Sequence, residues 1–186
     1  MKNIINIKQI DFSGSNVLEI GCGKTFNSYN FFKNTKIQHL TAIDMQCVED
    51  PQYTQRNVNV DIIVGDILES EILQKLIMYE PYDFVFAARF FNRQDDQECE
   101  RLLRQISKIK SSMYVFEEYK KDKKEKQFIG VDGLNKLSLN IFPNYQNTIF
   151  RNARILPQRY ANSGLASKIY RYFKPNCDVI VLEKID

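Results

Sequence analysis

The stretch Val17–Thr25 limits what this chain can fold into more than any other part of the sequence. An apolar, β-type run ends in an acid, and two glycines follow one residue apart, in the order Val-Leu-Glu-Ile-Gly-Cys-Gly-Lys-Thr. Glycine lets the backbone turn sharply and lets a ligand approach where a Cβ would collide. A buried strand that runs into a tight turn and then a helix needs this order of residues. The stretch therefore predicts an α/β domain that binds a nucleotide or a cofactor.

Length and composition narrow the class of protein. The 186 residues favour a single domain, 1–186, and 44% hydrophobic with 26% charged residues is typical of a soluble globular protein. No run approaches the roughly 18 apolar residues of a membrane helix, and the first residues do not resemble a signal peptide. The four cysteines are far apart and form no CxxC pair, which argues against zinc and fits reduced thiols. We therefore expect a cytoplasmic protein without a membrane span or a metal site.

Charge is unevenly distributed along the chain. Residues 1–99 carry 9 Lys/Arg and 14 Asp/Glu, so −5, whereas residues 100–174 carry 16 and 6, so +10. A basic second half would attract an anionic partner, but a solvated lysine-rich face has the same composition. Both interpretations stay open. Because His39 is the only histidine, the sequence argues against a His-based metal site and a Ser-His-Asp triad.

Apolar runs alternate with amphipathic stretches. Strands are predicted at 17–20, 37–45, 58–64, 83–88, 112–117, 146–156 and 178–183. Helices are predicted at 25–36, 69–79, 132–142 and 161–173, and in the stretch after Asn92. Asn92 is placed as the N-cap of that helix, whose buried stripe is Cys99, Leu102, Leu103, Ile106 and Ile109. The alternation predicts a parallel sheet with helices on both faces.

These features resemble the class I S-adenosylmethionine-dependent methyltransferases. The first motif of that family, a strand followed by E/D-x-G-x-G, matches the run from Glu19 to Gly23, and its next two strand-end acids match Asp44 and Asp66. The resemblance covers residues 15–118 well and the remainder only by the order of elements. It implies an α/β, Rossmann-like three-layer sandwich. The mostly parallel seven-stranded sheet of that fold has an antiparallel last strand.

The resemblance also implies S-adenosyl-L-methionine as the cofactor. It assigns Gly21, Cys22 and Gly23 to the turn beside the methionine part, with Glu19 orienting that turn. Asp44 is expected to accept hydrogen bonds from the ribose hydroxyls, a task that suits a carboxylate.

The same resemblance assigns four further cofactor contacts. Met45 is expected against the adenine face. Asp66 is expected to accept from the adenine amino group, and the backbone of Ile67 to donate to the ring. The backbone of Ala87, at the end of the fourth predicted strand, is expected to hold the amino-acid end of the cofactor.

Two other nucleotide-binding patterns fail. Gly23-Lys24-Thr25 matches the end of a P-loop, but the first glycine of that motif would fall at Leu18. The dinucleotide fingerprint GxGxxG would need a glycine at Phe26. Thr25 also stands where the methyltransferases often have a third glycine.

The methyl acceptor is not readable from the sequence, and no catalytic residue can be assigned. Arg89, just after the fourth predicted strand, is a substrate candidate, although a surface arginine or a structural ion pair explains it as well. Glu117 and its neighbour Glu118 end the fifth predicted strand and are expected to face the substrate, although solvated acids at a strand end explain them equally. The resemblance implies that residues 89–93 face the substrate, but they lack the D/N-P-P-aromatic signature of enzymes that methylate base amines. The segment 142–174 mixes cations with aromatic residues, a pattern that grips single-stranded nucleic acid but also describes an ordinary amphipathic element.

Two functional hypotheses follow. The first is a methyltransferase whose acceptor is unidentified, for example an RNA or a protein. The second is a non-catalytic methyltransferase-like subunit that acts as a binding module or scaffold for a protein partner. The presence of Glu19, Asp44 and Asp66 favours the enzyme, because a module without a cofactor needs no acids at that edge of the sheet.

Overall fold

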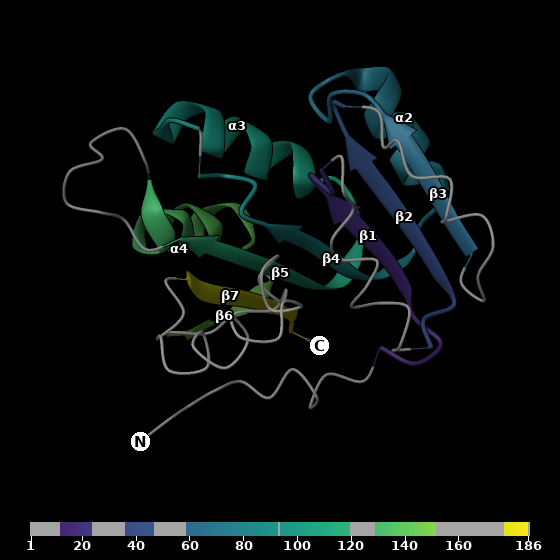
Figure 1. Cartoon of the computed structure of the whole chain (residues 1–186). Coiled ribbons are helices and arrows are strands. Elements are labelled where there is room, and N and C mark those ends of the chain that lie inside the picture. The colour runs from purple at the N-terminus through teal and green to yellow at the C-terminus, as the bar shows by residue number, and fades with distance from the viewer. Residues whose placement is uncertain are drawn as a thin grey trace, which may run out of the picture.

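A seven-stranded sheet in the order β3-β2-β1-β4-β5-β7-β6 forms the centre of the protein (Figure 1). This computed structural model describes residues 12–23, 36–46, 59–92, 94–119, 129–151 and 177–185. The strands are β1 (Asn16–Ile20), β2 (His39–Asp44), β3 (Asn59–Val64), β4 (Tyr82–Ala88), β5 (Ser111–Tyr119), β6 (Tyr145–Phe150) and β7 (Cys177–Lys184). The helices are α2 (Ser70–Met78), α3 (Asp96–Ile106) and α4 (Gly130–Ile141).

The direction of the strands confirms the predicted fold class. Strands β1 to β5 pair in parallel, whereas β7 runs antiparallel to both β5 and β6. The chain therefore has a Rossmann-like α/β fold, with a mostly parallel sheet and an antiparallel last strand. The carboxyl ends of parallel strands meet at one edge of a sheet. We call this edge, where β1 to β5 end and β7 begins, the carboxyl edge.

The central strands are buried on both faces: alternate residues point to opposite sides of the sheet, and successive residues of β1, β4 and β5 are buried. On β5, Tyr114 and Phe116 belong to a core shared with α2, α3 and α4, whereas Val115 belongs to a second buried cluster with Phe12. The stripe predicted for α3 is confirmed, since its apolar members are at most 3% exposed. In the part of the chain that the structure describes, α2, α3 and α4 thus cover one face of the sheet (Figure 1).

The start of α3 corrects one prediction. Asp95, not Asn92, is the N-cap: its Oδ1 accepts a hydrogen bond from the Glu98 N–H at 2.8 Å. The sequence offers two good capping residues three positions apart, and propensity alone does not choose between them. A turn in which the Gln94 N–H donates to the Phe91 carbonyl at 3.1 Å includes Asn92 and moves the start of the helix to Asp96.

Several predictions fall outside the described residues. These are the helices at 25–36 and 161–173, the last part of the strand predicted at 146–156, and most of the basic segment 142–174. Within the described ranges, no helix combines the length and the hydropathy needed to cross a membrane. The same ranges contain no cluster of three metal-binding side chains.

Candidate functional site

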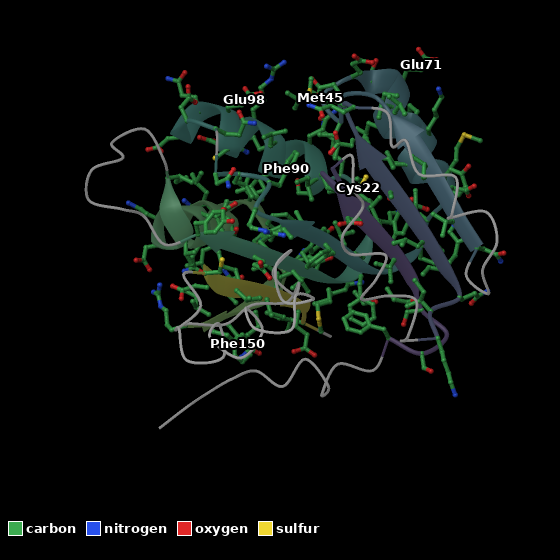
Figure 2. The ribbon with its side chains drawn as sticks, viewed as in Figure 1. Cys22, Met45, Glu71, Phe90, Glu98 and Phe150 are labelled. Carbon is green, nitrogen blue, oxygen red and sulfur yellow. The ribbon has the colours of Figure 1, made fainter. Side chains whose placement is uncertain are left out.

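A cavity of about 670 Å³ lies at the carboxyl edge, within the usual size range of small-molecule sites. Its walls come from the segments that follow β1, β2, β3 and β4, together with the first turns of α3 and the end of β5. Figure 2 shows Cys22, Met45, Phe90 and Glu98 gathered around this region from four of these segments. The strand order therefore brings together residues that are far apart in the sequence.

Both glycines of the first motif have backbone angles that other residues rarely adopt. The φ angles of Gly21 and Gly23 are +74° and +69°. A Cβ on Gly21 would lie 2.5 Å from Cδ2 of Phe90, whereas a Cβ on Gly23 would meet no described atom within 4 Å. The absence of a side chain at Gly21 thus makes room for a ring of the protein itself, and Gly23 leaves the cavity open.

Asp44 stands where β2 ends and binds the glycine turn. Its Oδ2 accepts from the Gly23 N–H at 2.8 Å, and its Oδ1 accepts from the Gln46 N–H at 2.9 Å. These bonds fix the carboxylate at the cavity wall. An ionised carboxylate has about four lone-pair sites, so two remain for a ligand. The neighbouring Met45 is 72% exposed and adds apolar surface to the same wall.

Asp66 occupies the equivalent place after β3. Its Oδ1 accepts from the Leu68 N–H at 2.9 Å, which closes a tight turn that also contains Ile67. Gly65 precedes it, and a Cβ there would lie 2.5 Å from Cδ1 of Ile72 on α2. Close packing of α2 therefore requires a glycine at position 65. The sequence did not reveal this contact.

Two residues of the first motif have different surroundings. Glu19 is 2% exposed within β1 and is not part of the cavity wall, although Ile20 and Gly21 after it are. Cys22 lines the cavity, where burial, and next the charges of Glu19 and Asp44, raise the pKa of its thiol far above the ordinary value. The thiol is therefore protonated at neutral pH and is not a nucleophile.

Arg89 lines the cavity just beyond β4 and has a φ of 55°, which is uncommon for a residue with a side chain. Its N–H donates to the Glu117 carbonyl at 2.6 Å, and its Nε lies 3.7 Å from Glu117 Oε1. Burial opposes the charge of the guanidinium, but a hydrogen bond with Tyr119 and the charge of Glu117 outweigh it, so the pKa of Arg89 is raised. Glu117 itself is fully buried and does not line the cavity.

Glu118 was considered together with Glu117 as an acid at the end of the fifth predicted strand, and the structure gives it a defined role. It is fully buried at the end of β5; its Oε2 accepts from the Phe91 N–H at 3.0 Å and its Oε1 from the Tyr119 N–H at 2.8 Å. Burial raises the pKa of Glu118 to about 7, partly offset by these two backbone donors. Strand alternation was the available signal, because it places Glu118 on the same face as Phe116 and opposite to Glu117.

The structure thus brings most, but not all, of the predicted site residues to one cavity. The predicted residues in its wall are Gly21, Cys22, Gly23, Asp44, Met45, Asp66, Ile67 and Arg89. Glu19, Ala87 and Glu117 are buried behind the wall, and Ala88 takes the place expected of Ala87. Phe90, from the stretch 89–93 that the resemblance assigns to the substrate side, lines the cavity, and so does Tyr119, which was not predicted.

The comparisons with known proteins concern the fold. No protein-family model and no curated protein matches the sequence. Solved structures do match, among them an S-adenosylmethionine (SAM)-dependent methyltransferase from Archaeoglobus fulgidus. Its TM-score is 0.60 at 19% identity, and the match covers 94% of this chain and 88% of that one. The chain has the class I methyltransferase fold.

Two other structures with this methyltransferase fold show its range. The 1,6-didemethyltoxoflavin-N1-methyltransferase of Burkholderia thailandensis matches with a TM-score of 0.61 at 12% identity, over 94% of this chain and 72% of that one. The plantazolicin methyltransferase BpumL, solved with S-adenosylhomocysteine (SAH), matches with a TM-score of 0.55 at 17% identity, over 92% and 76%. Their named substrates differ, as expected of a fold that supports many reactions.

Proposed function

We propose that this protein is a SAM-dependent methyltransferase whose cofactor binds in the cavity at the carboxyl edge. One observation carries the proposal. Three consecutive strand ends bring the glycine turn after β1 together with Asp44 and Asp66, and all of them line the same cavity. The fold of the structural neighbours supports the same reading.

The residues present fit this cofactor. Asp44 keeps lone pairs for two ribose hydroxyls after binding the Gly23 and Gln46 amides, and Asp66 keeps them for an amino group. The exposed Met45 offers apolar surface for an adenine ring. Gly23 leaves the backbone accessible to the amino-acid end of the ligand.

SAM supplies an electrophilic methyl group on a sulfonium, and its transfer is an in-line displacement. The protein's part in such a reaction is to bind, to align and to exclude water. Asp44 and Asp66 would anchor the adenosine, while Arg89, Phe90 and Tyr119 line the cavity at the ends of β4 and β5. The acceptor would meet the methyl group from that side. We infer that the acceptor is a larger molecule such as an RNA or a protein; an RNA would also be attracted by the excess of Lys and Arg in residues 100–174.

Calorimetry with SAM and SAH tests the proposal directly. The wild-type protein should bind both, and Asp44→Ala should weaken binding by roughly 1.5–3 kcal/mol, the value of hydrogen bonds to a charged group. Asp61→Ala is the matched control. Asp61 is the third residue of β3 and pairs with His39, the first residue of β2, at 3.0 Å; neither residue belongs to the cavity wall.

Two results would count against the proposal. If the wild-type protein does not bind SAM at millimolar concentration, the non-catalytic scaffold remains as the explanation of the fold. If Asp44→Ala binds as tightly as the control, the cofactor does not lie along this edge. If the protein does bind SAM, transfer of a labelled methyl group to total RNA or to total protein, with each digested separately, would identify the class of acceptor.

A further inference from the structure

We infer that Glu118 is a positioning residue that holds the turn Arg89–Asn92, one wall of the cavity, in the place where a ligand's amino-acid end must fit. The identity of that ligand rests on the function proposed above. The contacts that hold the turn do not depend on that function, because they are present in the protein without a ligand.

The end of β5 holds this turn at two points. The Arg89 N–H donates to the Glu117 carbonyl at 2.6 Å, and two residues later the Phe91 N–H donates to Glu118 Oε2 at 3.0 Å. The second oxygen of the same carboxylate accepts from the Tyr119 N–H at 2.8 Å. One buried side chain thus joins two cavity segments that lie 27 residues apart.

The Arg89–Asn92 turn also positions the ring of Phe90. The rings of Phe90 and Phe91 meet edge to face at 5.2 Å, and Phe91 meets Phe116 of the core in the same way at 5.5 Å. Phe91 is fully buried, so its position fixes that of its neighbour. Phe90 consequently lies against Gly21, where the missing Cβ leaves space for the ring.

The strand order separates this turn from the other end of the cavity. Along the carboxyl edge the sequence of strand ends is Asp66, Asp44, the Gly21 turn, the Arg89–Asn92 turn and finally Tyr119. Movement of the Arg89–Asn92 turn would therefore change the wall beside Gly21 and leave Asp44 and Asp66 in place. An effect of Glu118 on binding should be confined to the amino-acid end of the ligand.

Glu118→Gln tests this assignment, because it keeps the shape but replaces one acceptor oxygen with a donor that would face an N–H. We expect the affinity for SAH to fall by about tenfold, as is typical when a buried donor loses its acceptor, while the affinity for adenosine stays within about twofold. Glu118→Asp keeps the charge but is too short to reach both amides, and should show the same loss. Glu183→Gln, an exposed glutamate on β7 at the opposite edge, is the control.

A second measurement needs no ligand. Hydrogen exchange of the Phe91 amide should be slow in the wild type and in Glu183→Gln, and about tenfold faster in Glu118→Gln, with the β4 and β5 amides unchanged. Equal losses of SAH and adenosine affinity would show a general structural role and overturn the inference, as would full SAH affinity in either Glu118 variant. If the wild type binds neither ligand, the proposed function fails, and the exchange of Phe91 alone decides the role of Glu118.

Discussion

Replacing Glu118 with Gln should change how the stability of the protein depends on pH. Glu118 is fully buried, and burial raises its pKa from about 4.5 to about 7. Two neighbouring charges shift this pKa in opposite directions: Glu117 raises it and Arg89 lowers it. The Cys99 thiol on α3 and Asp178 on β7 are titratable groups on the elements packed against Glu118. A titratable group with different pKa values in the folded and unfolded states makes stability depend on pH.

The sign follows from which state holds the proton. Because the folded pKa is the higher one, the folded protein binds more protons between pH 4.5 and pH 7, and the free energy of unfolding falls as the pH rises through this window. Each tenfold change in the dissociation constant is worth about 1.4 kcal/mol. The contribution of Glu118 should therefore be about 2.5 kcal/mol lower at pH 8 than at pH 5, as an order of magnitude.

Urea unfolding of the wild type and Glu118→Gln at pH 5 and pH 8 measures this contribution. Other carboxylates titrate in both proteins, so they cancel in the difference between the two free energies. Relative to the wild type, Glu118→Gln should therefore be about 2.5 kcal/mol more stable at pH 8 than it is at pH 5. A difference that is the same at pH 5 and pH 8 would show that Glu118 has an ordinary pKa and would refute the reasoning.

Two further predictions concern backbone positions. Gly21→Ala should destabilise the protein by at least about 1 kcal/mol more than Gly14→Ala. Both residues have a φ near +74°, but only at Gly21 would the new Cβ collide with a ring, and thermal unfolding of the two variants compares them. Asp95→Ala should cost about 1 kcal/mol because it removes the cap of α3, whereas Asn92→Ala should cost much less. Urea unfolding of the two variants measures these losses, and equal losses would show that Asp95 is not the only residue that caps α3.

The local pattern of the sequence was enough to predict the strands and helices that the structure describes, apart from their exact ends. Apolar runs of strand length, helical stripes such as that of α3, and the glycine turn after Ile20 all follow from the chemistry of neighbouring residues. The positions of Asp44 and Asp66 at strand ends were predictable for the same reason. A parallel sheet then requires such residues to share one edge, which the register of β2 with β1 and β3 confirms.

Only the tertiary structure decided what lies against what at that edge. The sequence could not show that Phe90 occupies the space over Gly21, or that Glu118 rather than Glu117 binds a turn 27 residues away. Arg89, where the turn begins, has a φ of 55°, and strand alternation sets which way the last residues of β5 point. Such contacts join strands that are adjacent in the sheet but distant in the chain. No local preference of either segment encodes them.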